Sequence, residues 1–208
     1  MPLLIELLSP ASVVDVGCGT AAWLEVFVEH GVEDVVGIDG DHIDRGQLRI
    51  PADRFLARDL AEPFELERTF DVALSLEAAH YAPEESAAGL VASIAALAPV
   101  VLFSAAIPGQ GGGPGLNKQW PSYWGRLFAE RGFRAWDWLR PQIWEDERVD
   151  WWYAQNAVLY AREERGRELG LGEPAPILPL VHPIHFLEVT ERAPEEPPRR
   201  LFDRLRRK

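Results

Sequence analysis

Cysteine and basic residues are both scarce in this chain, and each shortage excludes a class of protein. Cys18 is the only cysteine among 208 residues, so the chain forms neither a disulfide framework nor a thiolate metal cluster. Lysine and arginine number 21 against 33 aspartates and glutamates, which gives a formal net charge of -12. Because nucleic-acid phosphates require a basic surface, we expect no nucleic-acid partner, and the cysteine usage favours a cytoplasmic location.

Long apolar runs are absent as well. Residues 1–11 are rich in leucine, but this stretch is too short to span a bilayer and has no basic leader. We therefore expect a short helix packed on the edge of a sheet, and no membrane partner. The length favours one domain over residues 1–165, followed by a proline-rich and charged extension over residues 166–208 that is partly docked or flexible.

Residues 13–20, Val-Val-Asp-Val-Gly-Cys-Gly-Thr, predict a strand, a tight glycine turn and then a helix over residues 21–30. Gly17 and Gly19 let a ligand approach the backbone closely, and the first N–H groups of the helix lack intrahelical partners. Asp15 would repel the phosphates of a dinucleotide, since bringing like charges together in a partly dry crevice is costly. The same carboxylate suits a cationic ligand.

Two more acidic residues follow at the ends of the next expected strands. Residues 35–38 form the second strand, which ends at Asp39, and residues 55–57 form the third, which leads to Asp59. An acid roughly 20 positions past the glycines is placed to accept hydrogen bonds from ribose hydroxyls. Together with Asp15, these side chains would lie at one rim of one sheet.

The rest of the chain alternates strands with helices, the pattern of a doubly wound α/β fold. The clearest helix follows Pro83 and has its apolar stripe between Leu90 and Leu97. Residues 140–153 are too few for a crossover helix between parallel strands, so the last strand is expected to be antiparallel. The seven expected strands lie near residues 12–16, 34–38, 54–58, 70–76, 99–104, 133–138 and 155–161.

At these residues the chain resembles the class I S-adenosylmethionine-dependent methyltransferases, over about residues 12–162. Residues 13–20 match the first motif of that family, and residues 37–39, 58–60 and 70–77 match the next three. The resemblance implies a Rossmann-like sheet of seven strands, mostly parallel with an antiparallel last strand, and S-adenosylmethionine as the cofactor. Many relatives have a third glycine where this chain has Ala21.

The resemblance also implies which residues hold that cofactor. Asp15 and the glycine turn would hold the methionine part, Asp39 the ribose, and Asp59 the adenine amino group with Leu60 beside the ring. The full set of implied cofactor-binding positions is Asp15, Gly17, Cys18, Gly19, Thr20, Asp39, Gly40, Asp59, Leu60 and Leu76.

Catalytic candidates lie in the loop after the fourth strand. His80 would take the proton from an acceptor hydroxyl or amine as the methyl arrives, and Glu77 would orient it. Alternatively, His80 bonds a loop carbonyl and Glu77 only caps backbone donors. Methyl transfer needs mainly the alignment of nucleophile, methyl and sulfur, so the reaction does not require a dedicated base.

The loop over residues 108–124 is glycine-rich at its start and aromatic at its end. This composition favours a mobile lid that closes on the acceptor through Trp120, Tyr123 and Trp124. The alternative is a surface connection whose tryptophans anchor the helix that begins at Pro121.

Other aromatic residues join the acceptor-binding hypothesis. Tyr81 follows His80, and Trp144 lies in the turn after the sixth strand. Trp151 and Trp152 either line a pocket or cover the sheet edge.

The C-terminal part of the chain suggests little chemistry. Two histidines at positions 182 and 185 have no matching acid or cysteine cluster, so no metal site is expected. Residues 199–208 are basic and are expected to form a solvated tail rather than a contact with an acidic partner or membrane surface.

The sequence therefore predicts methyl transfer to an oxygen or nitrogen of a small or medium-sized acceptor, such as a sugar or a secondary metabolite. One alternative is a methyltransferase of a peptide or a carrier-bound group, which would need a long groove. Another is an NAD(P)-dependent oxidoreductase, against which both Asp15 and the antiparallel last strand argue. A cofactor-binding scaffold without turnover is a further alternative, and the oligomeric state is left open.

Overall fold

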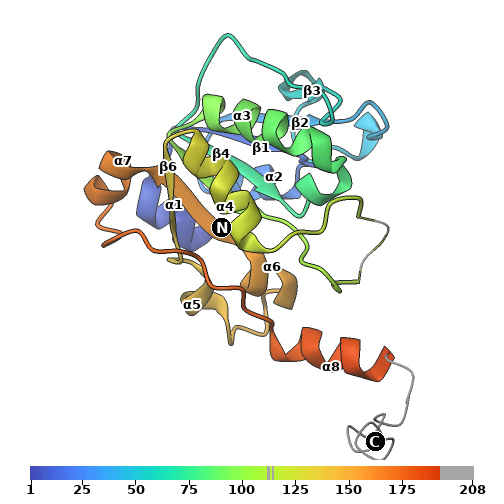
Figure 1. Cartoon of the computed structure of the whole chain (residues 1–208). Helices are drawn as coiled ribbons and strands as arrows, with labels where there is room; N and C mark the ends of the chain where they lie inside the picture. The colour runs from blue at the N-terminus through green and yellow to red at the C-terminus, as the bar shows by residue number, and fades with distance from the viewer. Residues whose placement is uncertain (112, 114, 193–208) are drawn as a thin grey trace, which may run out of the picture.

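The computed structural model describes residues 1–111, 113 and 115–192, and these form a seven-stranded sheet with helices on both faces (Figure 1). The strand order is β3-β2-β1-β4-β5-β7-β6. All pairs among β1 to β5 are parallel, whereas β7 is antiparallel to both β5 and β6. The prediction of a doubly wound Rossmann-like sheet with an antiparallel last strand is confirmed. The strands are β1 Ser12–Val16, β2 Asp34–Asp39, β3 Phe55–Ala57, β4 Val72–Leu76, β5 Val100–Ser104, β6 Phe133–Trp136 and β7 Val158–Arg162.

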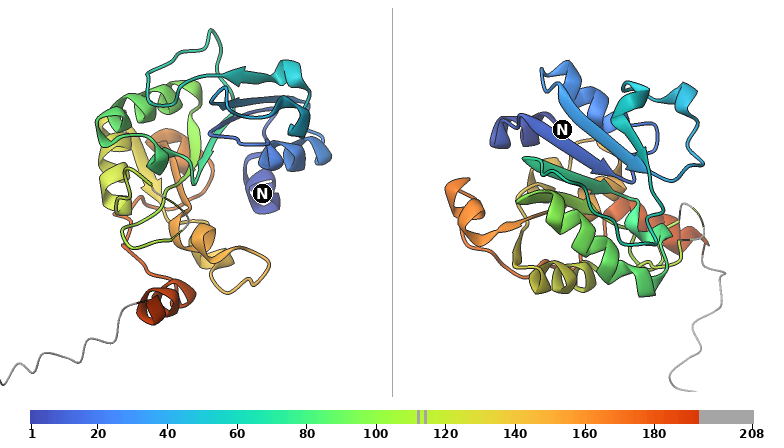
Figure 2. Two further views of the ribbon diagram at one scale, coloured as in Figure 1. Left: turned by 90° about the vertical axis from the view of Figure 1, so that its right-hand side faces the viewer. Right: turned by 90° about the horizontal axis from the view of Figure 1, so that it is seen from above.

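Alternation along the strands divides the core into two layers. Val14 and Val16 of β1 face one layer, which α3 and α4 cover, and Val13 faces the other, which α1 and α2 cover (Figure 2). The expected apolar stripe of the helix after Pro83 lies in the first layer. The α-helices are α1 Pro2–Leu8, α2 Ala22–Glu29, α3 Ala87–Leu97, α4 Pro121–Glu130, α5 Arg140–Ile143, α6 Trp151–Asn156, α7 Glu163–Glu168 and α8 Pro183–Arg192.

One expected boundary is wrong in a way that matters for the site. The last strand begins at Val158, not at residue 155, because residues 151–156 form the short helix α6, which closes with a bond from the Ala157 N–H to the Tyr153 carbonyl. Gln155 and Asn156 consequently lie at the end of a helix, where both side chains are buried and face polar partners.

The described part of the C-terminal extension is attached to the domain by buried polar groups. Arg140 is 1% exposed, forms an ion pair with Asp137, and donates to the carbonyls of Gln155 and Leu178 at 3.2 and 3.1 Å. The backbone N–H of His182 donates to Oε1 of Gln155 at 2.9 Å. These bonds fix the start of α8 beside α6 (Figure 1). The division at residue 165 stays a prediction, and the basic residues 199–208 lie outside the described residues.

Candidate active site

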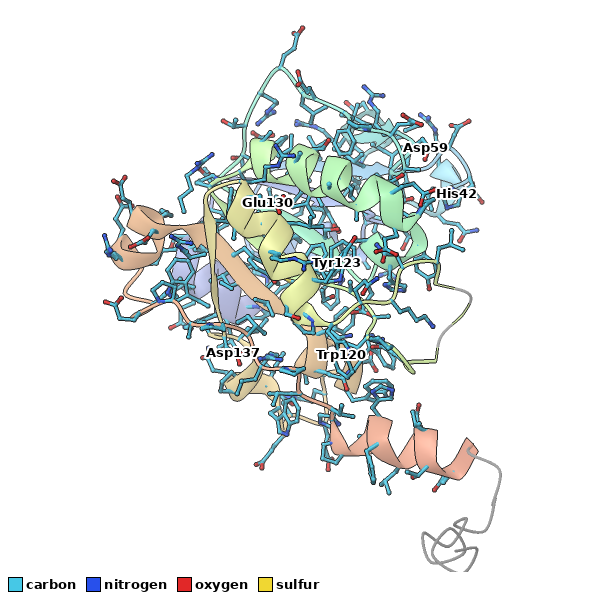
Figure 3. The ribbon with its side chains drawn as sticks, in the orientation of Figure 1. His42, Asp59, Trp120, Tyr123, Glu130 and Asp137 are labelled. Atoms are coloured by element: carbon cyan, nitrogen blue, oxygen red, sulfur yellow. The ribbon has the colours of Figure 1, made fainter. Side chains whose placement is uncertain are left out.

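A cleft of about 770 Å³ lies where the parallel strands β1 to β4 end. This is where a doubly wound sheet binds its ligands. Asp59 and His42 lie near each other at this edge in Figure 3. The lining residues come from the loops after these strands: Gly17, Gly19, Asp39, Gly40, Asp41, His42, Ile43, Ala57, Arg58, Asp59, Leu60, Ala61, Glu77, Ala78, Tyr81, Ala82 and Pro83.

The turn after β1 is held close to β2 and takes an unusual backbone path. The N–H groups of Gly17 and Cys18 both donate to the Ile38 carbonyl, at 2.7 and 3.2 Å. Gly17 has φ 84°, and a Cβ there would lie 2.1 Å from Cβ of Ala78, so only glycine fits. Ala21 also has a left-handed backbone, with φ 63°, so this chain keeps that conformation at the position where many relatives have glycine.

Asp39 is fixed by the same turn. Its Oδ2 accepts the N–H of Gly19 at 2.7 Å, and its Oδ1 accepts the N–H of Gly40 at 2.6 Å. An ionised carboxylate has about four acceptor sites, so these two bonds leave further lone pairs for donors in the cleft. Asp59 is similarly fixed, since its Oδ1 accepts the N–H of Ala61 at 2.9 Å, and its neighbour Leu60 is part of the apolar lining.

Asp15 lies beneath the turn and not on the surface of the cleft. It is 1% exposed, and within the described residues neither carboxylate oxygen has a hydrogen-bond partner. Burial, and then the charge of Asp39, raise the pKa of Asp15 to about 7. An ionised carboxylate is costly when it is buried without a partner. A cation bound nearby would therefore stabilise the charged form of Asp15.

Three other implied cofactor positions also lie outside the cleft lining. Cys18 and Leu76 are 7% and 8% exposed and belong to the hydrophobic core, where the Cys18 sulfur packs near Gly37. Their side chains are covered by the core, and their expected contacts with the cofactor stay a prediction. Thr20 contributes its carbonyl to the Arg49 N–H at 3.0 Å.

A second cavity, of about 270 Å³, adjoins the cleft and shares Glu77 and Tyr81 with it. Sequence reasoning singled out neither Gln110, within the predicted lid loop, nor Glu188, because both reach this cavity only through long-range packing. The lining residues are Glu77, His80, Tyr81, Gln110, Gly111, Trp151, Trp152 and Glu188.

Glu77 stands at the junction of the two cavities in a strained conformation. Its φ is 55°, which is uncommon for a residue other than glycine, and its N–H donates to the Ser104 carbonyl at 2.9 Å. Asn156 Nδ2 donates to its Oε1 at 3.1 Å, and Gln110 Nε2 donates to its Oε2 at 3.0 Å. Burial nevertheless raises the pKa of Glu77. The contacts of its carboxylate are with these two amides, and the expectation that Glu77 orients His80 stays a prediction.

His80 is not placed to act as a general base. Its Nδ1 accepts the backbone N–H of Ala106 at 3.1 Å, so the neutral ring carries its proton on Nε2. Neither ring nitrogen then has a free lone pair with which to take a proton from the methyl acceptor. Burial, and then the charge of Lys118, lower the pKa of His80 to about 4. The expected base role is therefore contradicted by the hydrogen bond, although the ring does line the second cavity.

We expect the ring of His80 to stay neutral, as the Nε2–H tautomer, throughout the range from pH 5 to pH 8. The reason is that protonation would break the bond from Ala106 and place a charge in a buried site. The measurement is a pH titration of the imidazole ¹⁵N shifts, with His80→Gln to assign the signal. Protonation of His80 with a midpoint between pH 6 and 7 would show that the ring is available for base catalysis.

The predicted aromatic lid residues are not in the cavities. Trp124 is 2% exposed and packs on Phe103, with ring centroids 5.0 Å apart, so its assignment to the acceptor is wrong: the helix α4 buries it in the core. Tyr123 packs edge-on against Trp124, and Trp120 lies exposed at the start of α4 (Figure 3). Tyr81 is the expected acceptor residue that lines both cavities.

Trp144 lies outside both cavities, whereas the start of the predicted lid lines the second one. Trp144 packs on His182, with ring centroids 4.8 Å apart, and is in neither cavity lining. In the loop, Gln110 and Gly111 line the second cavity, whereas residues 112 and 114 lie outside the described residues. Closure of this loop on an acceptor stays a prediction.

Neither a metal centre nor a membrane span is present in the described part of the chain. No group of three or more histidine, cysteine, aspartate or glutamate side chains there is arranged to hold a metal ion. None of the helices there has the length and apolar character needed to cross a bilayer.

Fold and site together define a nucleoside-binding α/β enzyme with acidic strand ends, and comparison with known proteins assigns the family. A family model described as "Methyltransferase domain" matches residues 2–157, most of the chain, so the chain belongs to this methyltransferase family. The resemblance to the class I enzymes is confirmed, and the cofactor is S-adenosylmethionine. No curated protein sequence matches the chain.

Solved structures share the fold at low sequence identity. Magnesium protoporphyrin IX methyltransferase from Synechocystis PCC 6803, with bound SAH, is 17% identical with a TM-score of 0.57, over 77% of this chain and 80% of that one. A sugar N-methyltransferase from Streptoalloteichus sp ATCC 53650 is 18% identical with a TM-score of 0.60, over 77% of this chain and 84% of that one. An amino pentose methyltransferase from Micromonospora echinaspora is 19% identical with a TM-score of 0.56, over 77% of this chain and 87% of that one.

Proposed function

We propose that this protein transfers the methyl group of S-adenosylmethionine to an oxygen or nitrogen of a small or medium-sized acceptor, such as a sugar or a secondary metabolite. The observation that supports this most directly is the second cavity, which meets the cofactor cleft at Glu77 and Tyr81. A small acceptor bound there would lie next to the cofactor with part of its surface shielded from water. Two of the structural neighbours act on sugars, which is consistent with this class.

The residues of the cleft fit the cofactor. We propose that the buried carboxylate of Asp15 attracts the cofactor's ammonium group from beneath the turn, that Asp39 accepts from the ribose hydroxyls beside Gly40, and that Asp59 binds the adenine amino group with Leu60 against the ring. When bound, the cofactor supplies an electrophilic methyl on a positively charged sulfur. Glu77, at the junction, is the carboxylate placed between cofactor and acceptor.

The peptide or carrier-bound alternative is less well supported. A macromolecular acceptor would need a long groove, whereas the cavity beside the cofactor cleft has a volume of only about 270 Å³. The expectations of a cytoplasmic location and of no nucleic-acid partner stay predictions, based on the cysteine usage and the net charge. An acceptor screen, with release of S-adenosylhomocysteine as the readout, would test the small-molecule class directly.

Asp39→Ala is expected to weaken the binding of S-adenosylhomocysteine by about 1–3 kcal/mol, because a charged acceptor is lost from the ribose site. The measurement is calorimetric titration of the variant against the wild type. Asp53→Ala is the matched control, since this exposed aspartate is not part of the cleft lining. Unchanged affinity in Asp39→Ala would remove Asp39 from the cofactor site.

A further inference from the structure

We propose that the carboxylate of Glu77 recognises the positively charged sulfur of S-adenosylmethionine and so favours binding of the methyl donor over its neutral product, S-adenosylhomocysteine. This inference rests on the proposed function, which places the acceptor in the second cavity. The residues that line both the cofactor cleft and that cavity are Glu77 and Tyr81. A methyl group that passes from one to the other starts where they meet, so the sulfur that carries it lies beside these residues.

The backbone of Glu77 is held at this junction in a strained conformation. The residue follows β4 directly, and its φ of 55° costs free energy for any residue except glycine. Its N–H donates to both the carbonyl and the hydroxyl oxygen of Ser104, at 2.9 and 3.0 Å, at the end of the neighbouring strand β5. Strain of this kind clusters at functional sites. The fold therefore maintains a carboxylate at a position where glycine would be less strained.

Gln110 is oriented as a hydrogen-bond donor toward one oxygen of this carboxylate. A backbone N–H can only donate, so the bond from Ile107 at 3.3 Å identifies the facing atom of Gln110 as its carbonyl oxygen, Oε1. The same oxygen accepts from Asn156 Nδ2 at 2.9 Å. The amide nitrogen of Gln110 is therefore directed to Oε2 of Glu77, at 3.0 Å.

Asn156 is oriented in the same sense by the docked C-terminal extension. The backbone N–H of His182 donates to Oε1 of Gln155 at 2.9 Å, so the amide nitrogen of Gln155 serves the other side of the network. That nitrogen donates to Oδ1 of Asn156 at 3.0 Å, and Asn156 Nδ2 in turn donates to Oε1 of Glu77 at 3.1 Å. Both amides that reach the carboxylate thus present N–H groups to it.

These bonds favour a negative charge at the junction without neutralising it. Burial raises the pKa of Glu77, and the bonds from Asn156, Ser104 and Gln110 oppose this rise because they stabilise the ionised form. Within the described residues the Glu77 carboxylate forms no ion pair, and the amides that reach it are neutral. A positive sulfur at the junction is attracted by this charge, whereas the neutral sulfur of the product is not.

The test is calorimetric titration of the full chain with S-adenosylmethionine and, separately, with S-adenosylhomocysteine. We expect Glu77→Gln to weaken S-adenosylmethionine about tenfold and to change S-adenosylhomocysteine by less than about twofold, because the two ligands differ only in the methyl group and the charge on sulfur. Glu77→Asp keeps the charge and should retain most of the wild-type ratio of the two affinities. Glu85→Gln is the matched control, since this exposed glutamate lines neither cavity.

Glu77→Gly is a second variant that removes the carboxylate while relieving the backbone, because glycine adopts φ 55° without strain. It should show the same selective loss of S-adenosylmethionine. Normal binding of S-adenosylhomocysteine by this variant would show that its cofactor cleft is intact.

Equal weakening of both ligands in Glu77→Gly, or unchanged affinity for both, would overturn the inference and leave the proposed function in place. The same selective loss in Glu85→Gln would also overturn it, because it would reflect only long-range charge. The proposed function fails separately, if no small acceptor leads the wild type to release S-adenosylhomocysteine. If the wild type binds neither ligand, the cofactor assignment fails and the inference fails with it.

Discussion

Asp15→Asn is expected to weaken the binding of S-adenosylhomocysteine roughly 10- to 100-fold, the effect of losing a buried negative charge that attracts the ligand's ammonium group across the turn. The carboxylate is 1% exposed and its oxygens have no partner within the described residues, so in the absence of ligand it contributes only a cost. Calorimetric titration measures the change. As a control, 5′-methylthioadenosine, which lacks the amino acid part, should bind the variant and the wild type alike.

The same substitution is expected to stabilise the unliganded protein above pH 7. The pKa of Asp15 is raised from 3.8 to about 7 on folding, so between about pH 4 and pH 7 the native state binds one proton more than the unfolded state. Stability from this group is therefore highest below pH 4 and falls as the pH rises through that window. Asparagine removes this loss, which amounts to at most about 4 kcal/mol. Urea unfolding at pH 5 and pH 8 measures it.

The outcome that would contradict this account is a variant that is less stable than the wild type at pH 8 and binds S-adenosylhomocysteine normally. Such a result would mean that Asp15 stabilises the turn and does not contact the cofactor. Tighter binding by the wild type as the pH rises past 7 is a second expected signature, since only the ionised carboxylate attracts an ammonium group.

Gly17→Ala is expected to destabilise the protein by about 3–5 kcal/mol and to abolish measurable cofactor binding. Two penalties combine: a left-handed backbone at φ 84°, and a new Cβ only 2.1 Å from Cβ of Ala78. Urea unfolding and calorimetric titration are the measurements. The double variant Gly17→Ala/Ala78→Gly should recover part of the loss, because it removes the clashing methyl group.

Gly31→Ala is the matched control for that experiment. Gly31 also has a positive φ, 90°, but a Cβ there would meet nothing within 4 Å, so only the backbone penalty of about 1–2 kcal/mol is expected. Equal destabilisation by the two substitutions would show that the contact with Ala78 is not what restricts the turn.

The residues proposed to hold the cofactor could be selected from the sequence because their signals are local. The apolar strand, the glycine turn and the acid at the next strand end lie within about 30 residues, and parallel strands bring their ends to one edge. The local pattern did not show how deeply each side chain is buried. Asp15, in β1, lies under the turn, and Cys18, in the turn after that strand, lies in the core, because long-range packing decides which of these side chains are covered.

The second cavity, which we propose binds the acceptor, was predictable only in part, because its residues come from distant parts of the chain. The second cavity joins Glu77, Gln110, Trp151 and Glu188, which are far apart in the sequence and meet only after α6 and α8 have packed. An aromatic residue beside a flexible loop looks the same whether it closes a site or fills a core, and Trp124 fills the core. The short helix over residues 151–156 also has too few turns for its periodicity to separate it from a strand.

Calorimetric titration of the wild-type protein, with S-adenosylhomocysteine in one series and NADH in the other, tests most directly that the acidic strand ends hold a sulfur nucleoside. The expected result is saturable one-site binding of S-adenosylhomocysteine and no binding of NADH, whose pyrophosphate would meet the charge of Asp39 and Asp15. Saturable binding of NADH with none of S-adenosylhomocysteine would contradict the account.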